Sequence, residues 1–423
     1  MSNNLPGSLN ERDGELWCEG VRLSELGEAV GTPCYVYSES TVRNRYADLA
    51  AAFAGCPTRV FYSVKANHNR AVLRLFRELG AGADVVSLGE LVRARRAGFA
   101  GADIVFGGVG KRRDELEAAL GEDVFMINVE SESELRALSE LAVARGAGAP
   151  VGIRVNPGIE AGGHAYTRTG HYKTKFGVAW EDAPALYELA TRLGGIEPVG
   201  LDAHLGSQIT SAEPYRQVLE RLSELVQAIR AQGHDVRYLD MGGGFGVPHE
   251  GEVGLDVRAV GEAAAAVASE LGLTVFIEPG RWLVAPAGVL LARVLYVKTL
   301  GEQRFYVTDT GSNDLVRPSY YSAYHPVEAV RRAPATEVSD IVGPVCEAGD
   351  FLALGCPMPA LQEGDLIAVL FAGAYGLVMS SNYNSRPRAA EVLVCGDRYR
   401  VVRRRETIDE LMAAEESDDE GSG

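Results

Sequence analysis

Lysine is scarce in this chain, which makes the position of one lysine informative. Arginine supplies most of the positive charge, and the 423 residues include only five lysines: Lys65, Lys111, Lys173, Lys175 and Lys298. Lys65 directly follows the apolar run at 60–64. A lysine amine whose pKa is lowered by burial can form an imine with an aldehyde. Lys65 is therefore a candidate for covalent attachment of an aldehyde cofactor, although a solvated lysine at a strand end would show the same local pattern.

Two further segments carry groups suited to an anionic cofactor with a basic ring nitrogen. The glycine run 242–244 lets backbone N–H groups approach an anion closely, which predicts a phosphate site. Glu278 could face a pyridine nitrogen and keep it protonated, which would make the ring a strong electron sink. Arg281 presents a planar guanidinium suited to a carboxylate. A tight loop and an ion-paired structural acid are the alternatives for the glycine run and for Glu278.

Two other motifs offer a ring contact and a proton donor. His204 could stack on a flat cofactor while Ser207 contacts its phosphate, although an isolated histidine can equally be a structural hydrogen-bonding residue. Cys346 adjoins Glu347, and an exposed thiol beside a carboxylate could deliver a proton. A buried, inert cysteine is the alternative for Cys346.

The elements that must position these groups follow a repeating pattern. Short apolar or β-branched runs alternate with helix-length segments, and the predicted strands are 60–64, 84–87, 104–107, 124–129, 151–155, 200–205, 236–241 and 275–278. This spacing suits parallel strands joined by crossover helices, and eight units predict a (β/α)₈ barrel. Active sites in that fold lie at the carboxyl ends of the strands, where Lys65, His204 and Glu278 fall. The alternative, a doubly wound sheet, would place ligand groups at one switch point.

The pattern changes after about residue 287. Period-two runs such as 289–297 and 366–370 predict a mainly antiparallel β-domain. The strand-like segment 33–37 suggests that the start of the chain joins it. We therefore expect a barrel at 36–287 and a β-domain formed by 1–35 together with 288–423.

Composition narrows the functional classes. The chain is 46% hydrophobic, without an apolar run long enough to cross a bilayer or a secretion signal at its start. Six scattered cysteines predict neither a zinc site nor a disulfide scaffold, which favours a reducing, cytoplasmic compartment and no metal. A net charge of −17 opposes binding to nucleic acid or anionic membranes. The acidic run 415–420 predicts a disordered tail from about residue 414.

In combination, the motifs resemble those of the diaminopimelate decarboxylases, which are fold-type III pyridoxal-phosphate enzymes built from a barrel and a β-domain. The resemblance covers nearly the whole chain. It is carried by FYSVKAN (61–67), ADVVSLGEL (83–91), HLGSQI (204–209), GGGFG (242–246), EPGR (278–281), NDLVRPSYY (313–321), GPVCEAGD (343–350), and GAYG with SNYNSRPR (373–388).

This resemblance implies a role for each matching residue. The cofactor is pyridoxal 5'-phosphate, with Lys65 as its Schiff-base residue, and the cofactor-binding set is Lys65, His204, Ser207, Gly242, Gly243, Gly244, Glu278, Gly280, Arg281 and Tyr375. The implied substrate ligands are Arg281, Arg317, Tyr321, Glu347 and Tyr375. Cys346 would be the proton donor and Glu347 the partner of the substrate ammonium, both reaching the site from the second subunit of a homodimer. The implied reaction converts meso-2,6-diaminopimelate to L-lysine and carbon dioxide.

A further stretch bears on the substrate. Residues 162–170, followed by 174–177, resemble the active-site loop of the family. This resemblance favours a diaminopimelate decarboxylase over the shorter diamine decarboxylases. Thr310, Ser312 and Ala348 depart from the pattern without removing a proposed chemical group. A related decarboxylase acting on another basic or D-amino acid remains the alternative.

Overall fold

The computed structural model describes residues 5–159, 174–248 and 254–415. The chain divides into two compact units, Arg45–Trp282 and Met1–Asn44 with Leu283–Gly423. The domain limits expected from the sequence, 36 and 287, stay a prediction. The expected active-site loop at 162–170 and residues 416–423 of the expected tail lie outside the described residues.

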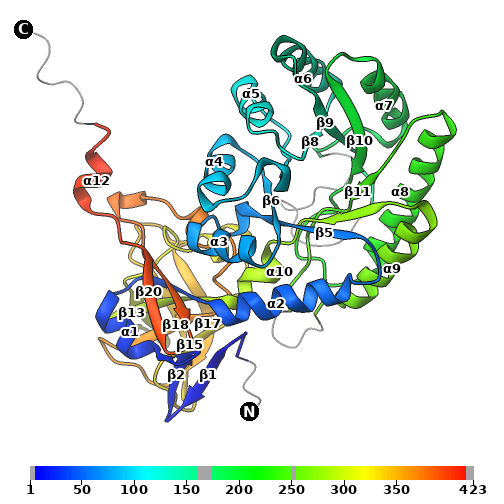
Figure 1. The fold of residues 1–423 in the computed structure, drawn as a ribbon. Coiled ribbons are helices and arrows are strands. Elements are labelled where there is room, and N and C mark those ends of the chain that lie inside the picture. Colours follow the sequence, from blue (N-terminus) through cyan, green and yellow to red (C-terminus); the bar gives the residue numbers. More distant parts are fainter. Residues whose placement is uncertain (1–4, 160–173, 249–253, 416–423) are drawn as a thin grey trace, which may run out of the picture. The chain divides into compact units, whose positions relative to one another are not determined.

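The unit Arg45–Trp282 is a closed barrel of eight parallel strands (Figure 1). The strands are β5 (Thr58–Ser63), β6 (Gly82–Val85), β7 (Ile104–Phe106), β8 (Met126–Val129), β9 (Ala149–Arg154), β10 (Ile196–Asp202), β11 (Tyr238–Asp240) and β12 (Thr274–Ile277). Parallel pairing of β12 with β5 closes the barrel. The predicted (β/α)₈ fold is confirmed, and closure removes the switch point that a doubly wound sheet would have.

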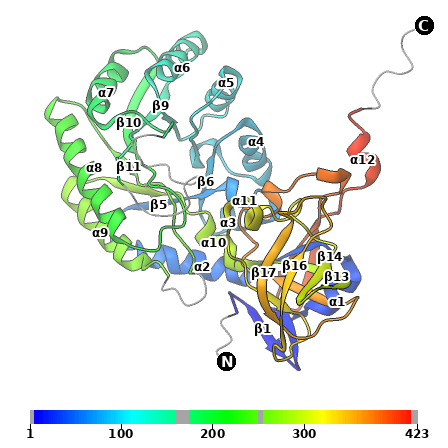
Figure 2. The same cartoon turned by 180° about the vertical axis from the view of Figure 1, so that it is seen from behind.

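Helices follow the strands and lie on the outside of the barrel (Figures 1 and 2). They are α3 (Arg70–Glu78), α4 (Leu88–Ala97), α5 (Arg113–Gly121), α6 (Glu132–Arg145), α7 (Ala183–Arg192), α8 (Glu213–Ala231) and α9 (Val257–Leu271). Side chains of Ser87, Ser131 and Asp256 accept backbone hydrogen bonds at the starts of α4, α6 and α9. Local capping chemistry therefore fixes where these three helices begin.

An aromatic cluster fills one part of the barrel interior. We define it as Phe61, Phe125, Tyr238 and Phe276, in which Phe61 and Phe276 are fully buried. The ring centroids of Phe61 and Phe276 lie 5.1 Å apart, and those of Phe125 and Tyr238 lie 5.2 Å apart. Tyr238 begins β11 and Phe125 immediately precedes β8, so the cluster packs toward the amino ends of the strands. Aromatic contact and burial therefore stabilise this end.

The other unit is built on a mainly antiparallel sheet, as predicted. Its central order is β17-β16-β14-β13-β4-β19-β20, with β18 pairing to β13 and to β15. The strands are β4 (Cys34–Ser38), β13 (Gly288–Leu300), β14 (Gln303–Thr308), β15 (Val327–Ala329), β16 (Glu337–Val342), β17 (Phe351–Met358), β18 (Leu366–Val369), β19 (Ala390–Cys395) and β20 (Arg398–Arg403). Because β4 lies between β13 and β19, an early segment of the chain is part of this sheet.

Smaller elements complete this unit. A three-stranded meander is formed by β1 (Leu9–Arg12), β2 (Glu15–Cys18) and β3 (Val21–Arg22), and its helices are α1 (Leu23–Val30), α11 (Arg317–Tyr321) and α12 (Ile408–Met412). Two helices, α2 (Glu39–Ala52) and α10 (Arg281–Val284), span the division between the units.

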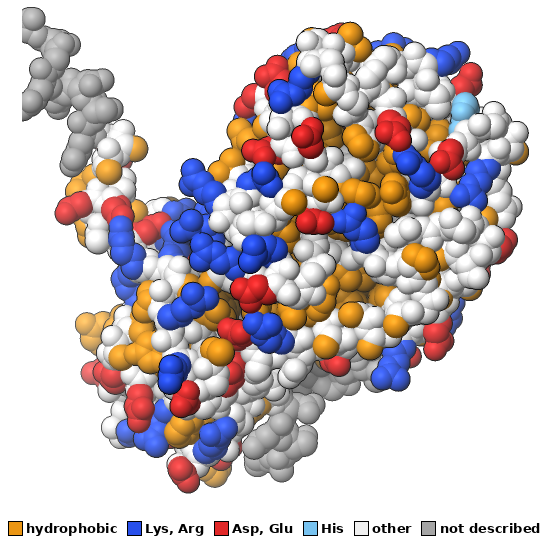
Figure 3. Space-filling model, in the orientation of Figure 1, with side chains coloured by type: hydrophobic (Ala, Val, Ile, Leu, Met, Phe, Trp, Pro, Cys, Tyr) orange, Lys and Arg blue, Asp and Glu red, His pale blue; other side chains and the backbone are white. Residues whose placement is uncertain are grey.

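The described surface carries charge of both signs. On the face shown in Figure 3, acidic and basic side chains are interspersed among apolar ones. None of the helices in the described ranges is both long and apolar enough to cross a membrane.

Candidate active site

Lys65 lies just beyond the first barrel strand. The strand ends at Ser63, and Lys65 occupies a single 3₁₀ turn, Val64–Ala66, rather than following a strand that runs to Val64. Its Nζ donates a hydrogen bond to Oδ2 of Asp84 at 3.1 Å, and the Asp84 side chain is buried on the neighbouring β6. The lysine side chain keeps 37% of its surface exposed. The amine is thus held by a buried carboxylate while remaining accessible to a small molecule.

A second barrel lysine provides a contrast. The Nζ of Lys111 donates to the backbone oxygens of Gly108 and Asn128 at 2.8 and 2.6 Å, and to Oε1 of Glu134 at 2.7 Å. Only 1% of the Lys111 side chain is exposed. The amine of Lys111 thus has three acceptors for its three N–H groups. Lys111 stabilises the barrel and is not placed to react with a small molecule.

Glu278 immediately follows β12, the strand that pairs with β5. Its backbone N–H donates to the carbonyl of Gly242 at 2.8 Å. The hydroxyl oxygen of Ser63 lies 2.9 Å from the Glu278 carbonyl and 2.8 Å from Oδ2 of Asp84. The structure therefore brings the segment bearing Lys65, the acid of the last strand and the glycine run to the same end of the barrel.

Buried carboxyl groups crowd this end. We define the rim cluster as five acids and two cations: Asp84, Glu130, Asp202, Asp240, Glu278, Lys65 and Arg154. Burial, reinforced by the neighbouring carboxylates, raises the pKa of Glu278 well above its usual range, with Lys65 opposing the shift. Burial and the charge of Asp240 likewise raise the pKa of Asp202. A further cation beside Glu278 would lower its pKa and would itself be stabilised, which fits a protonated pyridine nitrogen.

Arg154 neutralises part of this negative charge. It ends β9, and its Nη1 donates to Oε1 of Glu130 at 2.7 Å while its Nε lies 3.6 Å from Oδ2 of Asp202. The other oxygen of Glu130 accepts from the Gly177 amide at 2.9 Å. Arg154, Asp84 and Asp202 were not singled out from the sequence. Their signal was available, because each lies at or next to the last residue of a strand in a fold whose sites gather there.

His204 packs against the glycine run. The N–H of Gly243 donates to Nδ1 of His204 at 3.1 Å, so Nδ1 carries no proton. Burial, together with the positive charges of Arg154 and Lys65, holds the pKa of His204 well below its usual value. A neutral imidazole with its proton on Nε2 therefore lies at this end of the barrel.

Side chains larger than hydrogen are excluded along the glycine run. A Cβ on Gly242, whose φ is +65°, would lie 2.5 Å from Nδ1 of His204. Corresponding atoms on Gly243 and Gly244 would lie 2.0 Å from the carbonyl oxygen of Glu278 and 2.4 Å from that of Gly206. The amides of Gly242 and Gly243 are already engaged within the chain, by Asp240 and by His204. Their predicted contact with a phosphate stays a prediction, supported by this close packing.

The turn after Glu278 is joined to the segment after β10. Nη2 of Arg281 donates to the hydroxyl oxygen of Ser207 at 3.0 Å. A Cβ on Gly280 would lie 2.9 Å from that of Ala66, so glycine lets this turn pack against the segment that carries Lys65. Ser207, Gly280 and Arg281 are therefore gathered with the rim cluster.

In the β-sheet unit, Arg317, Tyr321 and Tyr375 are brought together. The guanidinium carbon of Arg317 lies 5.9 Å from the centre of each tyrosine ring. Nε of Arg317 donates to Nε2 of His325 at 3.2 Å, and Nδ1 of His325 lies 2.8 Å from the carbonyl oxygen of Leu370. His325 must therefore carry its proton on Nδ1, and it fixes the orientation of the buried guanidinium. His325 was missed, since its orientation depends on the backbone of Leu370, 45 residues further along the chain.

Cys346 and Glu347 lie on an exposed loop of the same unit. Cys346 is a free, exposed thiol, so the alternative of a buried, inert cysteine is wrong. Oε1 of Glu347 accepts a hydrogen bond from the hydroxyl of Tyr383 at 2.6 Å. Tyr383 was not singled out from the sequence. Among the three departures from the family pattern, Thr310 is buried, Ser312 donates its amide to Asp350, and Ala348 is exposed.

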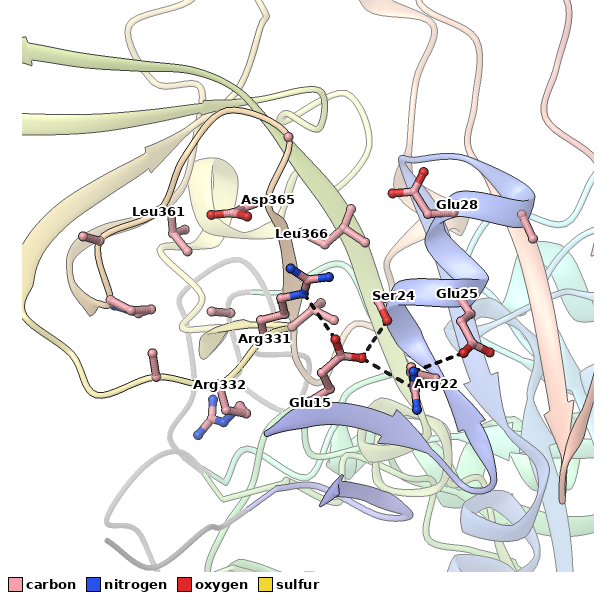
Figure 4. A pocket seen from close by; sticks show the side chains of 17 residues that line it. Glu15, Arg22, Ser24, Glu25, Glu28, Arg331, Arg332, Leu361, Asp365 and Leu366 are labelled. Carbon is pink, nitrogen blue, oxygen red and sulfur yellow. Dashed lines mark hydrogen bonds and ion pairs between the residues drawn. The ribbon is translucent and has the colours of Figure 1, made fainter. Parts of the chain in front are cut away.

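A separate cavity of about 860 Å³ contains none of the predicted site residues. It is lined by the N-terminal meander, α1 and the segments around β15 and β18 (Figure 4). Glu15 accepts a hydrogen bond from Ser24 at 2.8 Å and lies within ion-pair distance of Arg22 and Arg331. The charges that line the cavity thus compensate one another, and the Glu15 contacts link the meander to the sheet.

Comparisons with known proteins agree with this geometry. The family described as pyridoxal-dependent decarboxylase, pyridoxal binding domain, matches residues 39–285. A diaminopimelate decarboxylase from Pseudomonas aeruginosa is 48% identical over 413 residues, which cover 96% of this chain and 98% of the relative. The crystal structure of a diaminopimelate decarboxylase from Helicobacter pylori complexed with L-lysine is 37% identical with a TM-score of 0.90, covering 93% of this chain and 99% of that chain. A lysine decarboxylase from Selenomonas ruminantium is 27% identical with a TM-score of 0.79, covering 88% and 94%.

Proposed function

Because the chain belongs to the family of pyridoxal-dependent decarboxylases, we propose that it converts meso-2,6-diaminopimelate to L-lysine and carbon dioxide, the last step of lysine biosynthesis. The observation that carries this proposal is that the Lys65 amine, which donates to Asp84, lies at the same end of the barrel as the buried Glu278 carboxyl, close enough for its charge to oppose the rise in the pKa of Glu278. The high identity to diaminopimelate decarboxylases along nearly the whole chain supports the choice of substrate.

The rim cluster fits pyridoxal phosphate. When bound, this cofactor supplies an aldehyde for covalent attachment and a cationic ring that accepts the electron pair left behind by a departing carboxylate. Lys65 is the residue that would hold it covalently, and Glu278 would keep its ring nitrogen protonated. The crowding that raises the pKa of Glu278 favours pairing with a cation at that point. Ser207 and the glycines from Gly242 to Gly244 would hold the phosphate.

The remaining barrel residues would orient the cofactor ring, the Lys65 amine and a substrate carboxylate. Neutral His204, fixed by the Gly243 amide, would lie against the cofactor ring without adding a competing positive charge. Asp84 accepts a hydrogen bond from the Lys65 amine and would orient it whenever the amine is free. Arg281, anchored by Ser207, would hold a substrate carboxylate through its planar guanidinium.

The family resemblance assigns further roles to residues of the β-sheet unit. Arg317 and Tyr321 would bind a substrate carboxylate, with the guanidinium direction set by His325. Tyr375 would contact cofactor and substrate; its backbone φ of +56° is rare for a bulky side chain and is typical of functional positions. The Sγ of Cys346 would give a proton to Cα after carbon dioxide leaves, and Glu347 would bind the distal ammonium of the substrate.

The proposed assembly is a cytoplasmic homodimer in which Cys346 and Glu347 serve the site of the partner copy. Their exposure is compatible with such sharing. The same unit exposes large apolar side chains on β13, β16 and β17, which supports contact with a second copy of this chain; they are Tyr296, Leu300, Val338 and Leu354, each exposed by 59–68%. Light scattering would test this assembly, and a monomer at assay concentrations would contradict it.

A direct assay tests the function. Purified protein with pyridoxal phosphate should release carbon dioxide and lysine from meso-diaminopimelate, and should turn over lysine, ornithine and arginine far more slowly. The likeness to a lysine decarboxylase makes lysine the most informative competitor. Preferential turnover of lysine would replace the proposed substrate, and the absence of carbon dioxide from all four compounds would contradict the proposed reaction.

A further inference from the structure

The loop that carries Cys346 and Glu347 is in contact with a neighbouring turn. The hydroxyl of Tyr383 donates to Oε1 of Glu347 at 2.6 Å, and the backbone N–H of Cys346 donates to Oδ1 of Asn384 at 3.1 Å. Both members of the Cys346–Glu347 pair are exposed, so neighbouring core packing does little to restrict them. Backbone hydrogen bonds from Glu347 to Val345 and from Asp350 to Glu347 fold the loop locally. The two hydrogen bonds to the turn add contacts at the Glu347 carboxylate and at the backbone that carries the thiol.

This turn has an unusual backbone that its surroundings maintain. Asn384 and Ser385 both have φ of +54°, a left-handed conformation that non-glycine residues rarely adopt in succession. Such conformations persist where neighbouring contacts enforce them. Nδ2 of Asn382 donates to Glu406 at 2.8 Å, and the amide of Arg388 donates to the same carboxylate at 2.9 Å. Hydrogen bonds to Glu406 thus hold the turn on both sides of Asn384 and Ser385.

Asp350 anchors the end of the loop independently of the turn. Its two carboxylate oxygens accept hydrogen bonds from the amides of Ser312 and Val345, each at 2.6 Å. The loop fold therefore does not require Tyr383 or Asn384. What these two residues add is the placement of the groups between Val345 and Asp350.

We propose that Tyr383 and Asn384 are positioning residues for the decarboxylase reaction: Tyr383 orients the Glu347 carboxylate and Asn384 holds the backbone that carries the Cys346 thiol. This inference rests on the proposed function, which assigns an ammonium contact to Glu347 and a proton transfer to Cys346. A hydrogen bond to Oε1 leaves Oε2 of Glu347 available for an ammonium group. The bond to Glu347 and its charge raise the pKa of the Tyr383 hydroxyl, so the hydroxyl remains a donor at neutral pH.

The Tyr383 half of the proposal is tested by a double-mutant cycle. Tyr383→Phe in the cofactor-loaded enzyme should raise the KM for meso-diaminopimelate about tenfold, the size expected for losing a hydrogen bond to a charged group, with kcat changed less than about twofold. In the Glu347→Gln background the same change should have little further effect, because the tyrosine acts through the carboxylate. Tyr399→Phe on β20 is the matched control and should leave KM unchanged. Additive effects of Tyr383→Phe and Glu347→Gln would overturn the role of Tyr383.

The Asn384 half is tested by kinetics and by amide exchange. Asn384→Ala should lower kcat about tenfold, since the thiol-bearing backbone loses its acceptor, and Asn384→Asp should restore much of the rate because it keeps an acceptor oxygen. Hydrogen–deuterium exchange of the peptide containing Cys346 should accelerate in Asn384→Ala and not in Asn384→Asp. Exchange and kcat equal to those of the unaltered enzyme would overturn the role of Asn384.

Failure of the proposed function and failure of the positioning roles would give different results. If the unaltered enzyme does not decarboxylate meso-diaminopimelate, the proposed function is contradicted, and the exchange measurement still decides whether Asn384 holds the loop. If the unaltered enzyme is active and neither variant differs from it in KM, kcat or exchange, the positioning proposal alone is contradicted.

Discussion

The two ends of the barrel interior are built from opposite chemistry. Toward the amino ends of the strands lies the aromatic cluster, whose rings pack at centroid distances of 5.1 and 5.2 Å. At the carboxyl ends lies the rim cluster, whose five carboxyl groups outnumber its two cations, Lys65 and Arg154. The aromatic cluster stabilises the fold through burial, whereas the rim cluster retains negative charge that burial disfavours.

This difference indicates where stability and function lie in the barrel. Native proteins tolerate unfavourable groups chiefly at functional sites, and raised pKa values at several neighbouring acids are typical of such sites. Changes to the aromatic cluster should therefore reduce stability with little effect on the chemistry. Changes to the rim cluster should reduce catalytic activity with a smaller effect on stability.

The largest effect is expected for Lys65→Ala. Turnover should fall by about four orders of magnitude, because no other residue takes over covalent attachment of the cofactor. The absorbance of the imine between the lysine and the cofactor should disappear as well. The unfolding free energy, measured by chemical denaturation, should fall less than in Lys111→Met, because the Lys65 side chain is 37% exposed and Asp84 keeps its hydrogen bond from Ser63. Full activity in this variant would contradict the assignment.

Lys111→Met is the matched control for that change. It removes a buried amine and leaves Glu134 without its ion-pair partner, which should lower the unfolding free energy by about 3 kcal/mol. The kcat of the folded enzyme should stay within about twofold. Loss of turnover without loss of stability in Lys111→Met would contradict a purely structural role for Lys111.

Phe276→Ala should act mainly on stability. Truncating a fully buried ring should lower the unfolding free energy by about 3–5 kcal/mol. If this variant does not fold, Phe276→Leu offers a milder version of the same test. Both kcat and KM of the folded fraction should remain close to their original values. Loss of activity without loss of stability would break the distinction between the two ends.

Glu278→Gln should act mainly on chemistry. Losing the carboxylate that faces the ring nitrogen should lower kcat about a hundredfold. The free energy of unfolding of the cofactor-free protein should not fall, because the change removes one member of a crowded group of acids. Steady-state kinetics and denaturation on the same preparation separate the two effects, and unchanged kcat would remove Glu278 from the proposed site.

The smallest effect concerns Glu90, which is half-buried near Asp84. Burial, with the charge of Asp84, raises the pKa of Glu90 to about 7. Because the folded state holds this proton more tightly than the unfolded state, its contribution to stability is complete below pH 4.5 and is lost as the pH rises to about 7. Glu90→Gln should therefore be more stable than the original chain above pH 7, by no more than about 3 kcal/mol. Denaturation at pH 5, 6, 7 and 8 measures this gain, and a gain independent of pH would contradict the shift.

Much of the barrel could be predicted because its signals are local. Most strands are short apolar runs followed by helix-length segments, and the fold rule then places Lys65, His204 and Glu278 at one end. Asp84 and Asp202 were missed because a charged residue in a short strand is usually taken to face solvent. Only alternation around a closed barrel turns these side chains inward.

The β-sheet unit was harder to predict in detail. Its strands are recognisable from their alternation, but their order is not, because neighbours such as β4 and β19 are separated by more than 300 residues. The contact of His325 with Arg317 and that of Tyr383 with Glu347 lie outside the strands, and no periodic pattern in the sequence indicates them. Motif resemblance pointed to Arg317 and Glu347, whereas their partners emerged only with the tertiary structure.

The central claim is that Lys65 holds pyridoxal phosphate at the charged end of the barrel. Borohydride reduction of the cofactor-loaded enzyme, followed by peptide mass mapping, tests it most directly because reduction makes the covalent link permanent. The account predicts a pyridoxyl-phosphate modification on the peptide that contains Lys65 and none on the peptide that contains Lys111. Modification of another lysine with Lys65 left unmodified would contradict it.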